Sequence, residues 1–224
     1  MLQDVHMRYR NGCMKLFKTD SRNQLVFLAS AFVIHPQGYL LTVAHAISPD
    51  DTLMVVPAPA EAGFHPVSSE ALAAIPVRLA RMDKERDMAL LAFTDPVEIT
   101  MPDHVIGVPE NVSEGNGVAS LGFAFGFQCI YTQVLQQAVI CAKMRSTNET
   151  NMFLFDSRVH GGSKGGPLVG LDDLRVIGIV SGRFDPLEAT PVVDGTEPMP
   201  TSFSYAVSIE YAVPLLEKEG LEPI

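Results

Sequence analysis

Residues 161–168 read Gly-Gly-Ser-Lys-Gly-Gly-Pro-Leu, and this stretch says more about the fold than any other part of the chain. Glycine adopts backbone conformations that other residues avoid, so two glycine pairs around a dipeptide predict a tightly wound loop. In such a loop, neighbouring backbone N–H groups can point at one spot and stabilise a negatively charged oxygen. Ser163 and Lys164 lie between the two glycine pairs, at the tip of the predicted loop.

Short apolar runs separated by Gly, Pro, Asn and Asp occupy most of the chain around this loop. Such a rhythm is typical of many short strands joined by turns. The candidate strands cover residues 26–34, 39–43, 52–56, 77–80, 89–93, 117–122, 133–141, 152–155, 167–170, 176–180 and 204–207. A helix is expected over residues 209–218, where Pro214 would break or restart it. The pattern predicts an all-β protein with a short C-terminal helix.

Two shorter motifs precede the glycine-rich loop. Residues 40–46 read Leu-Leu-Thr-Val-Ala-His-Ala, which predicts a strand that ends beside His45. Residues 86–91 read Arg-Asp-Met-Ala-Leu-Leu, which predicts that Asp87 stands at the entry to another strand. An imidazole can take a proton from a nucleophile, and a carboxylate bonded to its other nitrogen holds the required tautomer. Taken alone, each residue could equally have a purely structural role at a strand end.

The order of these motifs along the chain resembles the trypsin-like serine peptidases, and within them the HtrA-like branch. Further segments are similar to that family, namely residues 119–127, 176–182 and 204–209. The resemblance implies a chymotrypsin-type double six-stranded β-barrel with a short C-terminal helix. It implies one domain over residues 1–224, with the N-terminal barrel in 1–105 and the C-terminal barrel and helix in 106–224.

The resemblance also implies where the nucleophile stands, directly before the Gly-Gly-Pro-Leu tail. That position holds Lys164, whereas the family carries a serine there. A one-residue insertion would make Ser163 the nucleophile instead. The family's upstream aspartate lies eight residues before its serine, and Asp156 lies eight residues before Lys164 but seven before Ser163. Gly162 also falls on the family's glycine without a gap, so the register favours a substitution.

Other positions acquire roles from the same resemblance. The backbone N–H groups of Gly162 and Lys164 would form the oxyanion hole, and the strand ending at Ser181 and Gly182 would bind an extended peptide. Arg158 falls at the base of the pocket that receives the substrate side chain. A basic group there would favour acidic substrates, and the alternative is that Arg158 points elsewhere.

Lys164 leaves three hypotheses for function. In the first, the protein is a catalytically impaired or inactive member of the family that binds a peptide or protein in its cleft. In the second, it is an active serine endopeptidase that uses Ser163 with His45 and Asp87. In the third, Lys164 is engineered or itself nucleophilic, which would require a lowered pKa. The plain structural alternative is a lysine that reaches solvent or pairs with Asp156.

The amino-acid composition limits the classes of partner that we expect. A net charge of −10 and a pI of about 5.0 argue against nucleic acid, because backbone phosphates require clustered Lys and Arg. The chain has no apolar run long enough to span a membrane, and its N-terminus lacks the pattern of a secretory signal, so a cytoplasmic location is expected. The three cysteines are irregularly spaced and the six histidines are scattered, so we expect no disulfide, no bound metal and no cofactor. The sequence leaves open whether the protein forms an oligomer.

Overall fold

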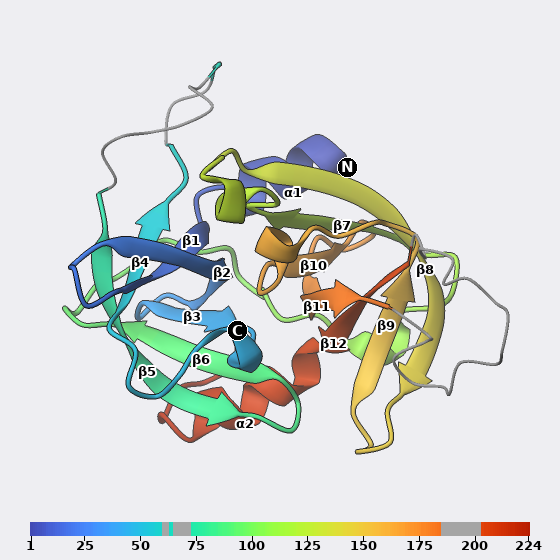
Figure 1. Cartoon of the computed structure of the whole chain (residues 1–224). Helices are drawn as coiled ribbons and strands as arrows, with labels where there is room; N and C mark the ends of the chain where they lie inside the picture. The colour runs from blue at the N-terminus through green and yellow to red at the C-terminus, as the bar shows by residue number, and fades with distance from the viewer. Residues whose placement is uncertain (60–62, 65–72, 185–202) are drawn as a thin grey trace, which may run out of the picture.

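The computed structural model describes residues 1–59, 63–64, 73–184 and 203–224. In this part of the chain, twelve antiparallel strands close into two six-stranded barrels that lie side by side (Figure 1). The all-β double barrel with a short C-terminal helix is confirmed.

Each barrel is built from strands that are neighbours in the chain or one hairpin apart. In spatial order, the first barrel contains β1 (Cys13–Thr19), β2 (Leu25–His35), β3 (Tyr39–Thr42), β6 (Met88–Phe93), β5 (Ile75–Asp83) and β4 (Leu53–Pro57). The second contains β10 (Pro167–Gly170), β11 (Val176–Arg183), β12 (Ser204–Ser208), β9 (Asn151–Phe155), β8 (Val134–Arg145) and β7 (Gly117–Gly122).

Consecutive residues of the central strands are buried on both faces. Leu90 and Leu91 in β6 are both inaccessible to solvent. Because successive side chains of a strand point to opposite faces, one fills the barrel while the next is covered from outside. This double burial explains why such strands read as continuous apolar runs rather than as alternating ones.

Each end of the chain packs on the barrel to which it does not belong. Helix α1 (Leu2–Tyr9) lies over β7 of the second barrel, and the Tyr9 hydroxyl donates to the Leu174 carbonyl at 2.7 Å (Figure 1). Helix α2 (Val213–Glu217) follows the second barrel but lies against the first (Figure 1). There Arg81 of β5 meets Glu219 at 2.7 Å. The termini therefore tie the two barrels together.

Two elements differ from the sequence-based expectation. The helix expected over 209–218 is divided into a 3₁₀ turn, η5 (Ile209–Ala212), and α2, with Pro214 in the first turn of α2. A proline is tolerated there because the N–H it lacks has no partner within the helix. Helix α1 and strand β1 were not predicted. None of the helices in the described residues is long and apolar enough to cross a membrane.

Candidate active site

His45 and Asp87 are brought together by the pairing of β3 with β6. His45 lies in the 3₁₀ turn η1 (Ala44–Ala46) just after β3, and Asp87 directly precedes β6. Because these strands are antiparallel, the end of one lies beside the start of the other. The imidazole Nδ1 is 2.8 Å from Asp87 Oδ2, and the His45 backbone N–H donates to Oδ1 at 2.9 Å. With a proton on Nδ1, the Nε2 atom remains available as a base.

A tight turn presents Asp87 to His45. Asp87 has a left-handed backbone, with φ of 51°. The preceding Asp83 accepts the N–H groups of Glu85 and Arg86 at 3.1 Å each, and it pairs with the Arg86 guanidinium at 3.1 Å. A left-handed conformation at a non-glycine residue persists only where its surroundings hold it in place. The Asp83 bonds supply that support.

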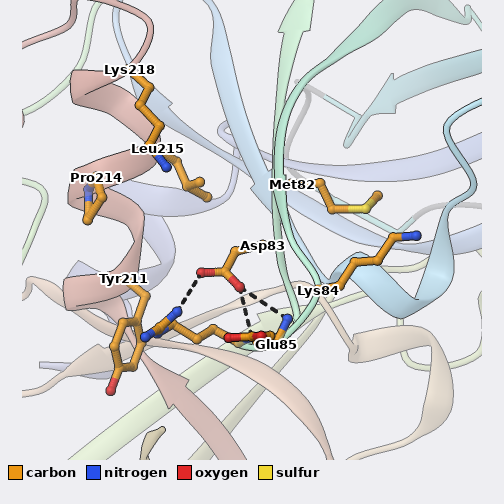
Figure 2. A pocket seen from close by; sticks show the side chains of 9 residues that line it. Met82, Asp83, Lys84, Glu85, Tyr211, Pro214, Leu215 and Lys218 are labelled. Atoms are coloured by element: carbon orange, nitrogen blue, oxygen red, sulfur yellow. Dashed lines mark hydrogen bonds and ion pairs between the residues drawn. The ribbon is translucent and has the colours of Figure 1, made fainter. Parts of the chain in front are cut away.

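The same turn forms one wall of a cavity of about 700 Å³ (Figure 2). The Cζ atom of the Arg86 guanidinium lies over the Tyr211 ring, 4.9 Å from the ring centre. Leu215 and Pro214 of α2 form the opposite side of the cavity (Figure 2). Tyr211 in turn accepts the Asn151 N–H at 2.9 Å. The turn that carries Asp87 is therefore buttressed by the C-terminal segment and by β9 of the second barrel.

The glycine-rich loop is held against the first barrel by close contacts. The Ser30 hydroxyl of β2 donates to the Gly162 carbonyl at 2.8 Å and accepts the Phe123 N–H at 2.9 Å. Gly165 has φ of +84°, and a Cβ on it would lie 2.1 Å from the Ser30 carbonyl oxygen. A Cβ on Gly162 would lie 2.2 Å from the Phe123 carbonyl oxygen. These positions require glycine because the backbones approach too closely for a side chain.

Ser163 and Lys164 occupy different environments within this loop. Ser163 is only 3% exposed, and its Cα lies 2.8 Å from where a Cβ on Gly122 would stand. Among the described residues, no hydrogen bond joins its hydroxyl to His45. Lys164 is half-buried, and its Cε lies 3.7 Å from where a Cβ on Gly182 would stand. Lys164 therefore extends over the end of β11, whereas Ser163 packs against Gly122 at the end of β7.

The amide groups assigned to the oxyanion hole are not both free. Residues Gly161–Ser163 form the 3₁₀ turn η4, and the Lys164 N–H donates to the Gly161 carbonyl at 3.3 Å. The Ser163 N–H donates to the His160 carbonyl at 2.9 Å. An oxyanion could receive the Lys164 N–H only after the Gly161 carbonyl has turned away. In the structure this half of the predicted hole is occupied by the protein's own backbone.

Within the described residues, strand β11 has a free edge beside Lys164. Up to residue 180 it pairs with the glycine-rich loop, since the Gly165 N–H donates to the Val180 carbonyl at 2.8 Å. Gly182 and Arg183 pair with β12 on the other side, and no described residue pairs with them on the side of β10. The Ser181 hydroxyl donates to the Ile179 carbonyl at 3.3 Å, so this side chain is directed back into its own strand.

Arg158 is exposed and has no ion-pair or hydrogen-bond partner in the described part of the chain. Two residues that sequence analysis did not select also shape the site. Ser30 ties the loop to the first barrel, and the Tyr205 ring lies 3.4 Å from where a Cβ on Gly182 would stand. The pairing of Gly182 with Tyr205 places this ring, and neither residue carries a local motif that predicts the pairing.

The family model for the trypsin-like peptidase domain matches residues 29–179, a span that includes His45, Asp87 and the glycine-rich loop. The chain belongs to the trypsin-like peptidase family. A probable periplasmic serine endoprotease of DegP type from Pseudomonas fulva (strain 12-X) is 29% identical over 70% of this chain and 29% of its own length. A protein of the same description from Rickettsia conorii (strain ATCC VR-613 / Malish 7) is 25% identical over 92% of this chain and 36% of its own.

This chain is similar to a solved structure, the HtrA-type protease AlgW with tripeptide, with a TM-score of 0.71 and 18% sequence identity. The match covers 99% of this chain and 64% of the AlgW chain. The HtrA-like resemblance drawn from the motifs is confirmed. The chain spans about a third of the length of the curated relatives it matches. The relatives are named as periplasmic, so the expected cytoplasmic location is wrong. The prediction of a cytoplasmic location was based on too weak a signal, the lack of a secretory pattern in the first residues.

Proposed function

We propose that this trypsin-like domain binds an extended peptide in its cleft and does not cleave it by the serine mechanism. Lys164 stands at the nucleophile position, with His45 and Asp87 in the places of the base and its orienting carboxylate. The proposal includes the division at residues 105 and 106, which falls between the end of β6 at Phe93 and the start of β7 at Gly117. From the names of the relatives, we infer a periplasmic location.

The contrast between Ser163 and Lys164 carries this proposal. A serine nucleophile must reach the imidazole and the substrate carbonyl at the same time. Ser163 is only 3% exposed and has no bond to His45 among the described residues, whereas Lys164 lies over the end of β11. A lysine side chain has no hydroxyl to acylate, and removing the serine of such a triad costs on the order of a million-fold in turnover.

Peptide binding survives the loss of the nucleophile because it uses the backbone. The edge of β11 at Gly182 and Arg183 has no partner strand on the side of the loop in the described residues. An extended peptide can add to such an edge by main-chain hydrogen bonds. The similar HtrA-type structure is described as being with a tripeptide, and a short peptide is the kind of ligand that we propose for this chain.

Fluorescence anisotropy with labelled decapeptides, followed by mass spectrometry of each peptide, tests binding and cleavage separately. We expect the wild type to bind peptides with dissociation constants in the micromolar range, a common range for small peptide interfaces, and to leave them intact. A Gly182→Leu variant should lose binding, because its side chain enters the space shared with Tyr205 and Lys164. Cleavage by the wild type that Ser163→Ala abolishes would replace this proposal with the serine endopeptidase.

A further inference from the structure

Within the described residues, the ammonium group of Lys164 is a cation without a counter-charge. Its side chain runs along Gly182, where the missing glycine side chain leaves room for it. No ion pair or hydrogen bond of the Lys164 ammonium exists within the described part of the chain. The carboxylate of Asp87, the acidic member of the site, is already bonded to His45 at 2.8 Å.

Two arginines belong to backbone segments that lie near Gly182. Arg183 directly follows Gly182 in β11 and pairs with Ser204 of β12. The Ser204 hydroxyl accepts the Val159 N–H at 2.9 Å, which places the segment containing Arg158 beside that pair. Arg158 and Arg183 are both exposed, and neither has an acidic partner among the described residues.

Three arginines elsewhere on the molecule are paired with carboxylates. Arg81, Arg86 and Arg145 each have a carboxylate oxygen within 3.3 Å. The protein carries a net charge of −10, so acidic side chains are in excess. An ammonium that is unpaired within the described residues creates a local positive potential on such a molecule, which attracts anionic partners and raises their association rate.

We propose that the cleft selects peptides carrying a carboxylate, which pairs with the Lys164 ammonium. This inference rests on the proposed peptide binding and names the class of peptide. The carboxylate can come from an Asp or Glu side chain or from a peptide C-terminus, and both sources present the same acceptor to the ammonium. Lys164 is then a specificity-determining residue.

The test measures the dissociation constants of decapeptides that carry an electrically neutral fluorophore and are uncharged except at one position. That position carries Glu, Gln or Lys and is moved along the peptide, and each peptide is prepared with an amidated or a free C-terminus. The amidated set reports on side-chain carboxylates, and the free Gln set reports on the terminal one. The proteins are the wild type, Lys164→Met, Lys164→Gln and a control, Lys218→Met, which removes an exposed cation at the end of α2.

We expect the best carboxylate peptide to bind the wild type about tenfold more tightly than its uncharged counterpart, as for a single charge-assisted contact. This preference should fall below about twofold in both Lys164 variants and persist in Lys218→Met, and it should weaken with added salt. Equal binding of Glu and Gln peptides by the wild type would overturn the selectivity and leave peptide binding intact. A preference retained in both Lys164 variants would also overturn it. If no decapeptide binds the wild type, the proposed function falls together with this inference.

Discussion

Replacement of Ser30 by alanine should destabilise the protein more than any ordinary serine-to-alanine change. The Ser30 side chain is fully buried in β2 and bridges two backbone groups, the Gly162 carbonyl and the Phe123 N–H. Ser30→Ala leaves both groups without this partner, and an unsatisfied buried polar group costs about 1–3 kcal/mol. We expect a loss of about 3 kcal/mol in the free energy of unfolding, allowing for partial relaxation of the loop.

A second buried serine provides a matched control. Ser208 is 1% exposed, and its hydroxyl has no hydrogen-bond partner in the described part of the chain. Ser208→Ala removes a buried polar atom that gains nothing from its surroundings, so stability should stay the same or rise by up to about 1 kcal/mol. The two variants have the same chemical change and nearly the same burial, and they differ only in the bonds made by the hydroxyl.

Urea unfolding followed by far-ultraviolet circular dichroism measures both changes, and the chain contains no tryptophan to serve as a fluorescent reporter. For a protein of this size, about 3 kcal/mol corresponds to a lowering of the melting temperature by roughly 6–12 °C. If Ser30→Ala and Ser208→Ala differed by less than about 0.5 kcal/mol, a change typical of an unremarkable surface substitution, the bridge would not hold the loop.

Three further predictions follow from buried or crowded positions. Burial lowers the pKa of Lys15 to about 8 from 10.5, so the unfolded chain binds more protons between these values and stability should rise with pH across that window. Lys15→Met should abolish this rise, which is measured as the difference between the two unfolding free energies at pH 7.5 and 9.5. Burial raises the pKa of the Cys13 thiol to about 12, so an aromatic disulfide reagent should modify the two exposed cysteines in the folded protein and Cys13 only after unfolding. Gly165→Ala should cost several times more stability than Gly220→Ala, because both glycines have left-handed backbones but only a Cβ at Gly165 meets other atoms, at 2.1 Å.

The sequence predicted the double barrel and the approach of His45 to Asp87, because both depend on strand pairing. Apolar runs reveal strands, and the ends of paired strands then meet. The elements at the N-terminus were missed for a specific reason. Strand β1 contains Lys15, which is 3% exposed and lies 5.1 Å from the centre of the Phe123 ring, in the second barrel's half of the chain. A lysine buried by contacts so distant in the chain interrupts the apolar pattern.

The state of the glycine-rich loop was beyond sequence reasoning. Glycine places few limits on the orientation of its own peptide groups, so the bond from the Lys164 N–H to the Gly161 carbonyl is not encoded by local residue types. The bridge from Ser30 to Gly162 joins residues 132 positions apart. Motif spacing selected the candidate residues of the site. The tertiary contacts determine how far each of Ser163 and Lys164 is exposed.

Intact-protein mass spectrometry after incubation with a peptidyl diphenyl phosphonate would decide whether Lys164 stands where the nucleophile belongs. Such a probe forms a bond to an activated serine hydroxyl and releases phenol, so labelling requires a hydroxyl beside the base. We predict that the wild type stays unmodified, that Lys164→Ser gains one adduct at residue 164, and that a further Ser163→Ala change leaves this adduct in place. Labelling of the wild type at Ser163, or a folded Lys164→Ser variant without an adduct, would contradict the assignment.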